Sequence, residues 1–171
     1  AELFSEISDY FIRCLYEDNR GRIWFGTLQN GLLCYDPNTV TLRKWSHEPG
    51  NPFSLPNNSV SALLIDRDGN WLIGHDGGVS LFDEQTNRFK TISLELHPGV
   101  RDVNNPVFQL LQLSSGDIMM ASFYGTYLIR KDSKGFYHGS NWKGFSSNVT
   151  GLAQTPDGHI WIATQFQGLY H

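Results

Sequence analysis

A short glycine-led segment recurs four times along the chain, and this repeat constrains the fold more than any other feature. Each copy begins with an anchor glycine that precedes an apolar stretch, and the anchors are Gly21, Gly69, Gly116 and Gly158. One apolar segment precedes each anchor, a second glycine opens another segment after it, and a further segment follows in the first three copies. Short strands repeated in fours with a period of roughly 46 residues are typical of β-propeller blades.

The composition and the local patterns favour the same fold class. The chain contains 17 glycines and 11 Phe, 7 Tyr and 5 Trp residues, which favour strands and turns. Residues 23–25 and 160–162 are apolar without alternation, as in strands covered on both faces by neighbouring sheets. The second strand keeps one small residue in every copy, which indicates a close approach between blades: Gly26, Gly74, Ala121 and Ala163. We therefore predict an all-β protein, a β-propeller segment of about four four-stranded blades with little helix.

The repeat also predicts where each blade begins and ends. We place the blades at approximately 12–59, 60–106, 107–148 and 149–171. The last repeat supplies only three strands, so residues 1–11, with an apolar segment at Leu3 and Phe4, are expected to supply its outer strand. The blades form either a closed four-blade ring or part of a larger propeller, including a ring of about eight blades made by two copies. The repeat alone does not choose between these arrangements.

Charge and hydropathy exclude several kinds of partner. The net charge of −4 argues against nucleic acid, whose protein partners normally present a basic face. The apolar runs are far shorter than the about 20 residues that a membrane helix requires, so no membrane insertion is expected in this segment. Residues 1–11 lack the basic and apolar stretches of a signal peptide.

Two cysteines, Cys14 and Cys34, fall on the first and third strands of one blade. A strand between them separates their backbones by about 9 to 10 Å, twice the spacing of paired strands. A disulfide requires Cα atoms within roughly 7 Å. We predict two free and largely buried thiols.

The full motif resembles a known repeat. The pattern V-x-x-L-x-x-D-x-x-G-x-L-W-I-G-T followed by G-L-x-x-Y-D is matched by residues 12–36 and, with Trp71 and Leu72 in exchanged order, by residues 60–83. This pattern resembles the two-component regulator propeller repeat, and the linker over residues 47–60 is similar to the inter-blade connection of that family. The third repeat departs from it, with Met119-Met120-Ala121 in place of Trp-Ile-Gly.

The resemblance implies a function. Propellers of this family form the periplasmic sensor of hybrid two-component systems in polysaccharide-degrading bacteria, and the histidine kinase lies elsewhere in the parent protein. This segment is then expected to be a non-catalytic sensor fragment without a cofactor. It would bind an oligosaccharide ligand, or act as a signal-transmitting scaffold and dimerisation surface that contacts a second copy or the remaining blades of its parent chain. The alternatives are a free-standing interaction scaffold and a lyase-like enzyme, because the repeat is also similar to streptogramin-lyase-type propellers.

The candidate ligand residues lie on loops. We label the strands of each blade a to d from hub to rim; the b–c and d–a loops of a propeller then share one face. Aromatic rings beside amide and carboxylate groups suit a sugar, which stacks its C–H face and hydrogen-bonds its hydroxyls. The residues of this kind are Gln29, Asn30, His75, Asp76, Phe123, Tyr124, Trp142, Gln165 and Phe166. The d–a loops at 46–59, 93–106 and 138–148 add His47, His97 and His138. The competing interpretation is that the aromatics cap blade ends and the polar residues tie off turns.

No pattern predicts a metal or a catalytic pair. His75 and Asp76 are suited to acid–base chemistry, but neighbours on a tight loop often point apart. Residues 66–70 resemble the start of a calcium loop, yet the position of its bidentate glutamate is occupied by Gly77. We interpret residues 66–70 as a hairpin turn.

The tryptophans divide into two groups. Trp24, Trp71 and Trp161 lie on the second strand of their blades, so they are predicted to be core residues. Trp45 and Trp142 lie at or beyond blade ends and are predicted to be partly exposed.

Overall fold

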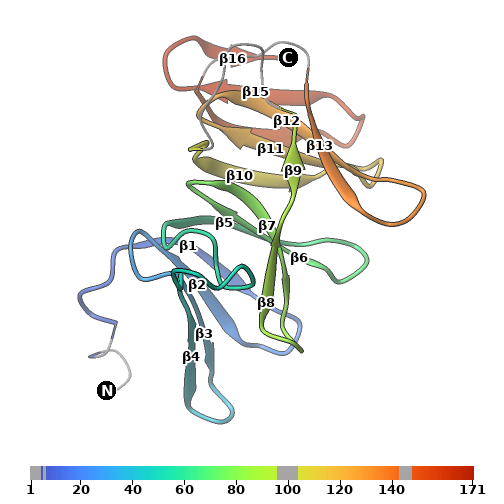
Figure 1. The fold of residues 1–171 in the computed structure, drawn as a ribbon. Helices are drawn as coiled ribbons and strands as arrows, with labels where there is room; N and C mark the ends of the chain where they lie inside the picture. The colour runs from blue at the N-terminus through green and yellow to red at the C-terminus, as the bar shows by residue number, and fades with distance from the viewer. Residues whose placement is uncertain (1–4, 6, 96–103, 143–147) are drawn as a thin grey trace.

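The chain is all-β and is folded as an open arc of blades. The computed structural model describes residue 5 and residues 7–95, 104–142 and 148–171. Its strands form four sheets that follow one another along the arc, with the sheet of β1 and the sheet of β16 at opposite ends (Figure 1). Within these residues a closed ring is not seen. Of the arrangements that the sequence left open, the structure shows an open arc of blades.

Blades 1 and 2 are four-stranded antiparallel sheets whose strands pair in sequence order. The strands of blade 1 are β1 (Ile12–Glu17), β2 (Ile23–Thr27), β3 (Leu32–Asp36) and β4 (Thr41–Trp45). Those of blade 2 are β5 (Val60–Ile65), β6 (Trp71–His75), β7 (Gly78–Asp83) and β8 (Arg88–Thr91).

Blades 3 and 4 differ from this arrangement at their outer edges. The strands of blade 3 are β10 (Val107–Gln112), β11 (Ile118–Ser122), β12 (Gly125–Lys131) and β13 (Tyr137–Asn141), and the strands of blade 4 are β14 (Val149–Gln154), β15 (Ile160–Thr164) and β16 (Gly168–Tyr170). Blade 4 is therefore three-stranded in the described residues. The outer strand expected from Leu3 and Phe4 falls outside them.

An additional strand covers the rim of blade 3. β9 (Ser93–Leu94) leaves blade 2 and pairs in parallel with β13, although the sequence predicted a loop over this segment. Gly139 makes this pairing possible, because a Cβ atom at this position would collide with the side chain of Leu94. His138 also lies on β13 and not in a loop, which corrects the predicted start of the loop at 138.

Anchor glycines lie in tight turns, including the turn predicted for residues 66–70. Gly69 and Gly158 have φ angles of 83° and 92°, in the left-handed region that glycine adopts without steric cost. Asp66 accepts hydrogen bonds from the backbone N–H groups of Asp68 (3.0 Å) and Asn70 (2.8 Å), which closes the turn around one carboxylate. The turn interpretation of residues 66–70 is confirmed.

Side chains at one equivalent position of each repeat pack against the following blade. The residue three positions after the anchor glycine faces the following blade, and Trp24 accordingly packs on Trp71 of blade 2 with ring centroids 4.4 Å apart. The small second-strand residue gives room for the following strand a: a Cβ atom on Gly26 would lie 2.7 Å from the carbonyl oxygen of Val60. Gly74 faces Val107 in the same way. The predicted close approach of the blades is confirmed.

The tryptophan prediction is correct except at blade 4. Trp24 and Trp71 are buried, whereas Trp161 is 37% exposed, so its assignment to the core is wrong. The physical reason is that no blade follows blade 4 in the described residues, and the face that Trp161 occupies is left uncovered. Trp45 and Trp142 are half-buried, as expected.

The cysteines lie as the strand assignment predicted. Cys14 on β1 pairs with Gly26 and Cys34 on β3 pairs with Trp24, so β2 runs between them and both thiols are free. Burial raises the pKa of each thiol to about 11. In the described part of the chain no helix has the length and apolar character of a membrane span.

Candidate functional site

The predicted loop face exists. The backbone N–H of Asp76 in a b–c loop donates to the carbonyl of Ser59 in a d–a linker (3.2 Å), and Phe123 donates to Pro106 in the same manner (2.9 Å). In blade 1 the backbone N–H of Leu28 donates to the carbonyl of Phe11 in the same way. In blade 4 the backbone N–H of Gln165 donates to the carbonyl of Asn148. The b–c loops therefore lie beside the start of strand a in every blade, as the sequence predicted.

His75 does not reach this face. It lies at the end of β6 and is fully buried. Its Nδ1 accepts a hydrogen bond from the backbone N–H of Gly77 (3.1 Å), which leaves the proton on Nε2 to be donated to Ser80 Oγ (2.9 Å). Burial lowers the pKa of His75 to about 4, so the ring is neutral at physiological pH. The side chain ties the β6–β7 hairpin together and has no access to a ligand.

Asp76 links two blades near the hub. Its Oδ1 accepts a hydrogen bond from Arg13 Nη1 of β1 (3.2 Å), and the same nitrogen donates to Ser59 Oγ (2.7 Å). The carboxylate is thus committed to an ion pair between blades 1 and 2. His75 and Asp76 engage different partners, so they form no acid–base pair.

The b–c loops of blades 3 and 4 carry exposed aromatic side chains. Phe123 is 46% exposed and packs edge-on against Tyr124, with ring centroids 5.1 Å apart. The backbone N–H of Tyr124 donates to Oδ1 of the buried Asn105 (3.2 Å), whose Nδ2 has no hydrogen-bond partner among the residues that the structure describes. Phe166 of the next b–c loop is 84% exposed. Such rings are available to stack on a ligand.

The remaining candidates are dispersed. Gln29 is exposed on blade 1, and the backbone of Asn30 there donates to Thr27 Oγ1 (2.9 Å). Gln165 accepts a hydrogen bond from Asn148 Nδ2 beside Phe166. Trp142 is half-buried, and its backbone N–H donates to the carbonyl of Thr126 (3.0 Å). The structure therefore groups Phe123 with Tyr124 and separates Gln29 and Asn30 from them.

The three histidines of the predicted d–a loops have different positions. The ring of His47 contacts the carbonyl of Leu55 within its own linker, at 3.1 Å from Nδ1. His97 falls outside the described residues. His138 projects from β13 and its Nε2 lies 3.2 Å from Asp132 Oδ2.

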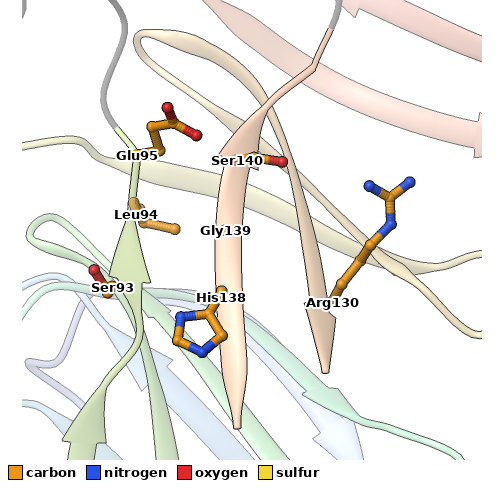
Figure 2. Close-up of a pocket in the computed structure, with 7 residues that line it drawn as sticks. All are labelled: Ser93, Leu94, Glu95, Arg130, His138, Gly139 and Ser140. Atoms are coloured by element: carbon orange, nitrogen blue, oxygen red, sulfur yellow. The ribbon is translucent and has the colours of Figure 1, made fainter. Parts of the chain in front are cut away.

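His138 borders a hollow at the rim. Figure 2 shows it and Arg130 projecting from neighbouring strands, with Glu95 beyond Leu94 on the other side. This hollow of about 400 Å³ forms where β9 runs beside β13. Arg130 is held by Asp117, with Nε 3.0 Å from Oδ2.

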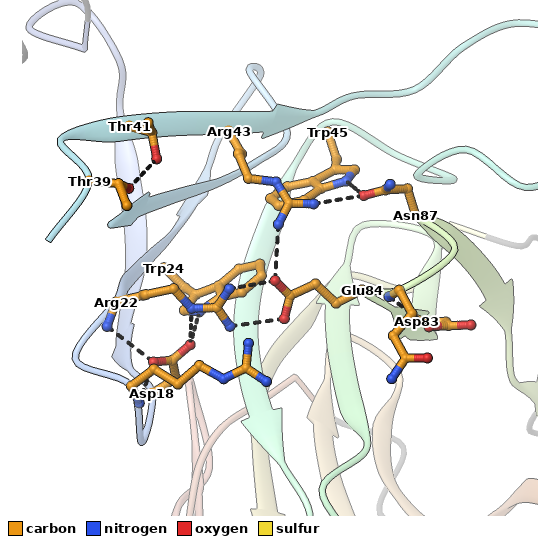
Figure 3. A network of polar contacts seen from close by, with 12 residues as sticks. Asp18, Arg22, Trp24, Thr39, Thr41, Arg43, Trp45, Asp83, Glu84 and Asn87 are labelled. Carbon is orange, nitrogen blue, oxygen red and sulfur yellow. Dashed lines mark hydrogen bonds and ion pairs between the residues drawn. The ribbon is translucent and has the colours of Figure 1, made fainter. Parts of the chain in front are cut away.

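The opposite face carries a polar network that the sequence analysis missed. Asp18, in the a–b turn of blade 1, accepts hydrogen bonds from Trp24 Nε1 (2.9 Å) and Arg22 Nε (2.7 Å) (Figure 3). Arg22 also donates to both carboxylate oxygens of Glu84, in the c–d turn of blade 2, with Nη2 2.9 Å from Oε2. Arg43 Nη1 donates to Glu84 Oε1 as well (3.0 Å). We call this network the first clasp.

The carboxylates of the first clasp stay ionised. Burial alone raises the pKa of Asp18, but the hydrogen bonds from Trp24, Arg22 and Arg20 outweigh burial and hold that pKa below its usual value. The hydrogen bond from Arg22 lowers the pKa of Glu84.

A second clasp joins blades 2 and 3 at the equivalent place. Lys131, the last residue of β12 before the c–d turn of blade 3, contacts the carboxylate of Asp68 and has its Nζ 3.6 Å from Asp66 Oδ2. The hydroxyl of Tyr137 donates to Asp66. Burial raises the pKa of Tyr137 to about 12, with the Asp66 hydrogen bond adding to the rise.

The clasps have a sequence signal that could have revealed them. Glu84 and Lys131 both lie six residues after the second glycine of their repeats, Gly78 and Gly125. A hollow accompanies each clasp, of about 540 Å³ at blades 1 and 2 and about 170 Å³ at blades 2 and 3. The first hollow has Trp71 and Phe82 on its walls together with charged and amide groups.

Comparison with known families decides the nature of the repeat. The sequence profile described as "Two component regulator propeller" matches residues 6–29, 54–77 and 143–166. Three segments of the chain therefore match the two-component regulator propeller repeat. The matches fall in the first, second and fourth repeats, where the glycine-and-tryptophan pattern is strongest.

Known relatives are much longer than this chain. Histidine kinase P4 from Formosa agariphila is 33% identical over 79 residues, which are 46% of this chain and 6% of that protein. The extracellular domain of a putative hybrid two component system from B. thetaiotaomicron superposes with a TM-score of 0.65 and 20% identity, over 92% of this chain and 21% of that one. Virginiamycin B lyase from Staphylococcus aureus superposes with a TM-score of 0.64 and 13% identity, over 90% of this chain and 49% of the lyase. At these identities the structural likeness shows the propeller fold alone.

Proposed function

We propose that the chain is a non-catalytic part of the sensor region of a hybrid two-component regulator, located in the periplasm. Its repeats and its likeness to a histidine kinase over 79 residues support this proposal. The fold, shared with the extracellular domain of a hybrid two component system, is compatible with it. The kinase lies outside this segment.

The burial of His75 and the ion pair of Asp76 support a role other than catalysis. His75 is buried and neutral, and Asp76 is paired with Arg13. Acid–base catalysis requires a titratable group within reach of a substrate, and neither residue offers one. The likeness to virginiamycin B lyase rests on the fold at 13% identity.

The observation that carries the sensing role is the pair of exposed aromatic loops on neighbouring blades. Phe123 and Phe166 present rings to solvent on the loop face, and the exposed side-chain amide of Gln165 lies next to Phe166. Rings stack on the C–H faces of sugars and amides bond their hydroxyls. We infer that a glycan-derived ligand contacts this face.

The test is a glycan array followed by calorimetry on the purified chain and its variants. The double variant Phe123→Ala/Phe166→Ala is expected to lose at least about tenfold in affinity for any glycan bound, because each ring contributes on the order of 1 kcal/mol. Phe136→Ala is the matched control, since Phe136 is 51% exposed but lies beside the c–d turn of blade 3. Equal affinities of the double variant and the wild type would exclude this face and leave the scaffold and dimerisation role.

A further inference from the structure

A hollow of about 540 Å³ lies between blades 1 and 2 at the first clasp. We propose that this hollow binds a small hydroxylated carboxylate, that is a sugar acid, and that the guanidinium of Arg20 pairs with the carboxylate. The hollow belongs to the face opposite the b–c loops. The inference therefore goes beyond the proposed function and does not depend on it.

The hollow has the size and the walls of a small-molecule site. Its volume falls in the range of about 300–1,000 Å³ that such sites occupy. The half-buried Ile65 and Leu81 supply apolar wall from blade 2. The exposed side chains that line the hollow include one cation and two amides, those of Arg20, Asn19 and Gln85. An apolar wall with a few polar groups is the usual composition of a ligand pocket.

The charges of the first clasp balance one another. Arg22 donates its Nε to Asp18 (2.7 Å) and both of its Nη atoms to Glu84, as Figure 3 shows. Arg43 Nη1 donates to Glu84 Oε1 (3.0 Å). Two cations and two carboxylates are thus matched within the network, and the clasp itself brings no net charge to the hollow.

Asp83 also lines the hollow, but its carboxylate closes the c–d turn of blade 2. It accepts hydrogen bonds from the backbone N–H of Gln85 (2.9 Å) and from the hydroxyl of Thr86 (2.6 Å). Its position is therefore explained by the turn.

Arg20 is the cation that remains without a partner. Its backbone N–H donates to Asp18 Oδ1 (2.9 Å), which fixes its place in the a–b turn. Its exposed guanidinium makes no hydrogen bond or salt bridge with the residues that the structure describes. The hydrogen bond from Arg22 is the main cause of the lowered pKa of Glu84, to which the charge of Arg20 adds only a small part. Arg20 is thus available to a ligand.

The second junction shows the same position with a partner. Asp68 directly precedes the anchor glycine of blade 2, as Arg20 precedes that of blade 1, and Asp68 pairs with Lys131 of blade 3. The hollow there measures about 170 Å³. At the first junction the equivalent of Lys131 is Glu84, which is already paired with Arg22. The larger hollow therefore coincides with the unmatched cation.

These groups define the class of ligand. A guanidinium binds a carboxylate through two parallel N–H···O bonds. The side-chain amides of Asn19 and Gln85 make no hydrogen bond with the described residues, so they can donate to hydroxyl groups and accept from them. Ile65 and Leu81 can contact the C–H face of a ring. A neutral sugar would leave Arg20 unpaired, and an inorganic anion would leave the amides and the apolar wall unused.

The acidic group is a carboxylate and not a phosphate. A phosphate ester carries about −1.5 to −2 charges at neutral pH, whereas a carboxylate carries one. Arg20 offers a single unmatched positive charge, and the carboxylates of Asp18, Asp83 and Glu84 line the same hollow. A ligand with one negative charge matches this arrangement.

The test is an NMR titration of the 15N-labelled 171-residue chain with D-glucuronate, D-glucose and sodium sulfate. D-Glucuronate is expected to shift the amide signals of Asn19, Arg20 and Gln85. It is expected to bind at least about tenfold more tightly than D-glucose, because the two sugars differ in the group that pairs with Arg20. This preference should decrease as the salt concentration rises, because salt screens an exposed charge.

The variant Arg20→Gln is expected to lower the affinity for D-glucuronate at least about tenfold and to leave the affinity for D-glucose unchanged. Its Tm should equal that of the wild type, because the side chain is exposed and the backbone bond to Asp18 is kept. Arg67→Gln is the matched control. Arg67 lies in the a–b turn of blade 2, donates to the carbonyl of Ser114 (3.1 Å) and is not among the residues that line the hollow. This control should bind D-glucuronate as the wild type does.

Several results would overturn the proposal. They are the absence of saturable shifts with D-glucuronate, equal affinities for D-glucuronate and D-glucose, and D-glucuronate binding that Arg20→Gln leaves unchanged. Sulfate that binds as tightly as D-glucuronate at the same amides would also overturn it, because the hollow would then be a simple anion site. The double variant Phe123→Ala/Phe166→Ala should keep its affinity for D-glucuronate, so this proposal and the sensing proposal fail separately.

Discussion

The junction between blades 1 and 2 and the junction between blades 2 and 3 carry opposite charges at one equivalent position, six residues after the second glycine of the following blade. At the first, the acidic Glu84 of the following blade meets Arg22; at the second, the basic Lys131 meets Asp68. Side-chain exposure differs as well: Arg22 and Glu84 are 11% and 20% exposed, whereas Lys131 and Asp68 are 31% and 68% exposed. The Arg22–Glu84 pair is therefore nearly withdrawn from water, and the Lys131–Asp68 pair lies at the surface.

The apolar contacts of the two junctions also differ. Trp24 stacks on Trp45 of its own blade (centroids 5.4 Å apart) and contacts Trp71 and Phe82 of blade 2. Its equivalent at the second junction is Leu72, which packs in a mostly aliphatic cluster that includes Ile118. The repeat thus sets where blades touch, while the chemistry of each contact varies from junction to junction.

The largest loss of stability is expected when the junction between blades 1 and 2 loses its central aromatic residue. Trp24→Ala should lower the free energy of unfolding by about 3–5 kcal/mol, because it leaves a cavity between blades and removes a donor from Asp18. Trp161→Ala, at the equivalent but exposed position, should cost less than about 1 kcal/mol. Urea denaturation followed by circular dichroism measures both. Similar losses for the two variants would contradict the assignment of Trp161 to an uncovered face.

The next effect concerns the charge of the first clasp. Arg22→Met should destabilise the chain by about 2–4 kcal/mol, because it leaves the buried carboxylate of Asp18 without its cation. The same denaturation experiment at pH 7 checks the value. A loss below about 1 kcal/mol would show that the hydrogen bonds from Trp24 and the backbone suffice for Asp18.

As the pH is lowered, the free energy of unfolding should fall in two separate pH ranges, and His75 accounts for the upper range. Since burial lowers its pKa to about 4, the unfolded state binds the proton more readily, and stability falls as the pH drops from about 6.5 towards 4. The expected loss is roughly 2 kcal/mol at pH 4.5. The pKa values of Asp18, Glu84 and Asp66 are lowered, so the stability that these groups contribute is present at neutral pH and is lost only below about pH 4.

The variant His75→Thr separates these ranges, because Thr27 fills the same position in blade 1 and its hydroxyl bonds the carbonyl of Gly31. Its stability should be nearly constant from pH 7 to about 4.5, while the decline at lower pH persists. Thermal unfolding across this range provides the measurement. A decline above pH 4.5 that persists in the variant would assign it to another group.

The smallest effect is expected at the second clasp. Lys131→Met should cost about 1 kcal/mol, because its pair with the exposed Asp68 contributes little and the buried Asp66 keeps its hydrogen bonds from Tyr137 and Asn70. The loss should shrink further in 1 M NaCl, where the Debye length is about 3 Å. A loss as large as that of Arg22→Met would show that the two clasps are equivalent despite their different exposure.

Much of this architecture could be predicted from short stretches of sequence. Glycine at Gly69 and Gly158 indicates a tight turn, and an apolar run such as residues 160–162 indicates a strand, although in β15 one face, predicted to be buried, is uncovered in the described residues. The position of β2 between Cys14 and Cys34 follows from the repeat. These features are local, because a turn or a strand depends on residues within one repeat.

The candidate site was less predictable. His75 has a residue type that suits ligand binding, yet its side chain turns inward because Ser80 on the paired strand offers a hydrogen-bond partner. Phe123 and Phe166 could be placed on the loop face from their position in the repeat, and the structure adds that both are exposed.

The sequence by itself determined the repeat, the strands, the turns and the small residues that bring blades together, because each depends on neighbours along the chain. Only the tertiary structure decided the open arc, the parallel pairing of β9 with β13, and the clasps that join Arg22 to Glu84 and Asp68 to Lys131. These contacts join residues about 60 positions apart, and their strength depends on how far each blade shields them from water. The exposure of Trp161 has the same origin, since a residue identical in its local pattern to Trp24 is buried only where another blade covers it.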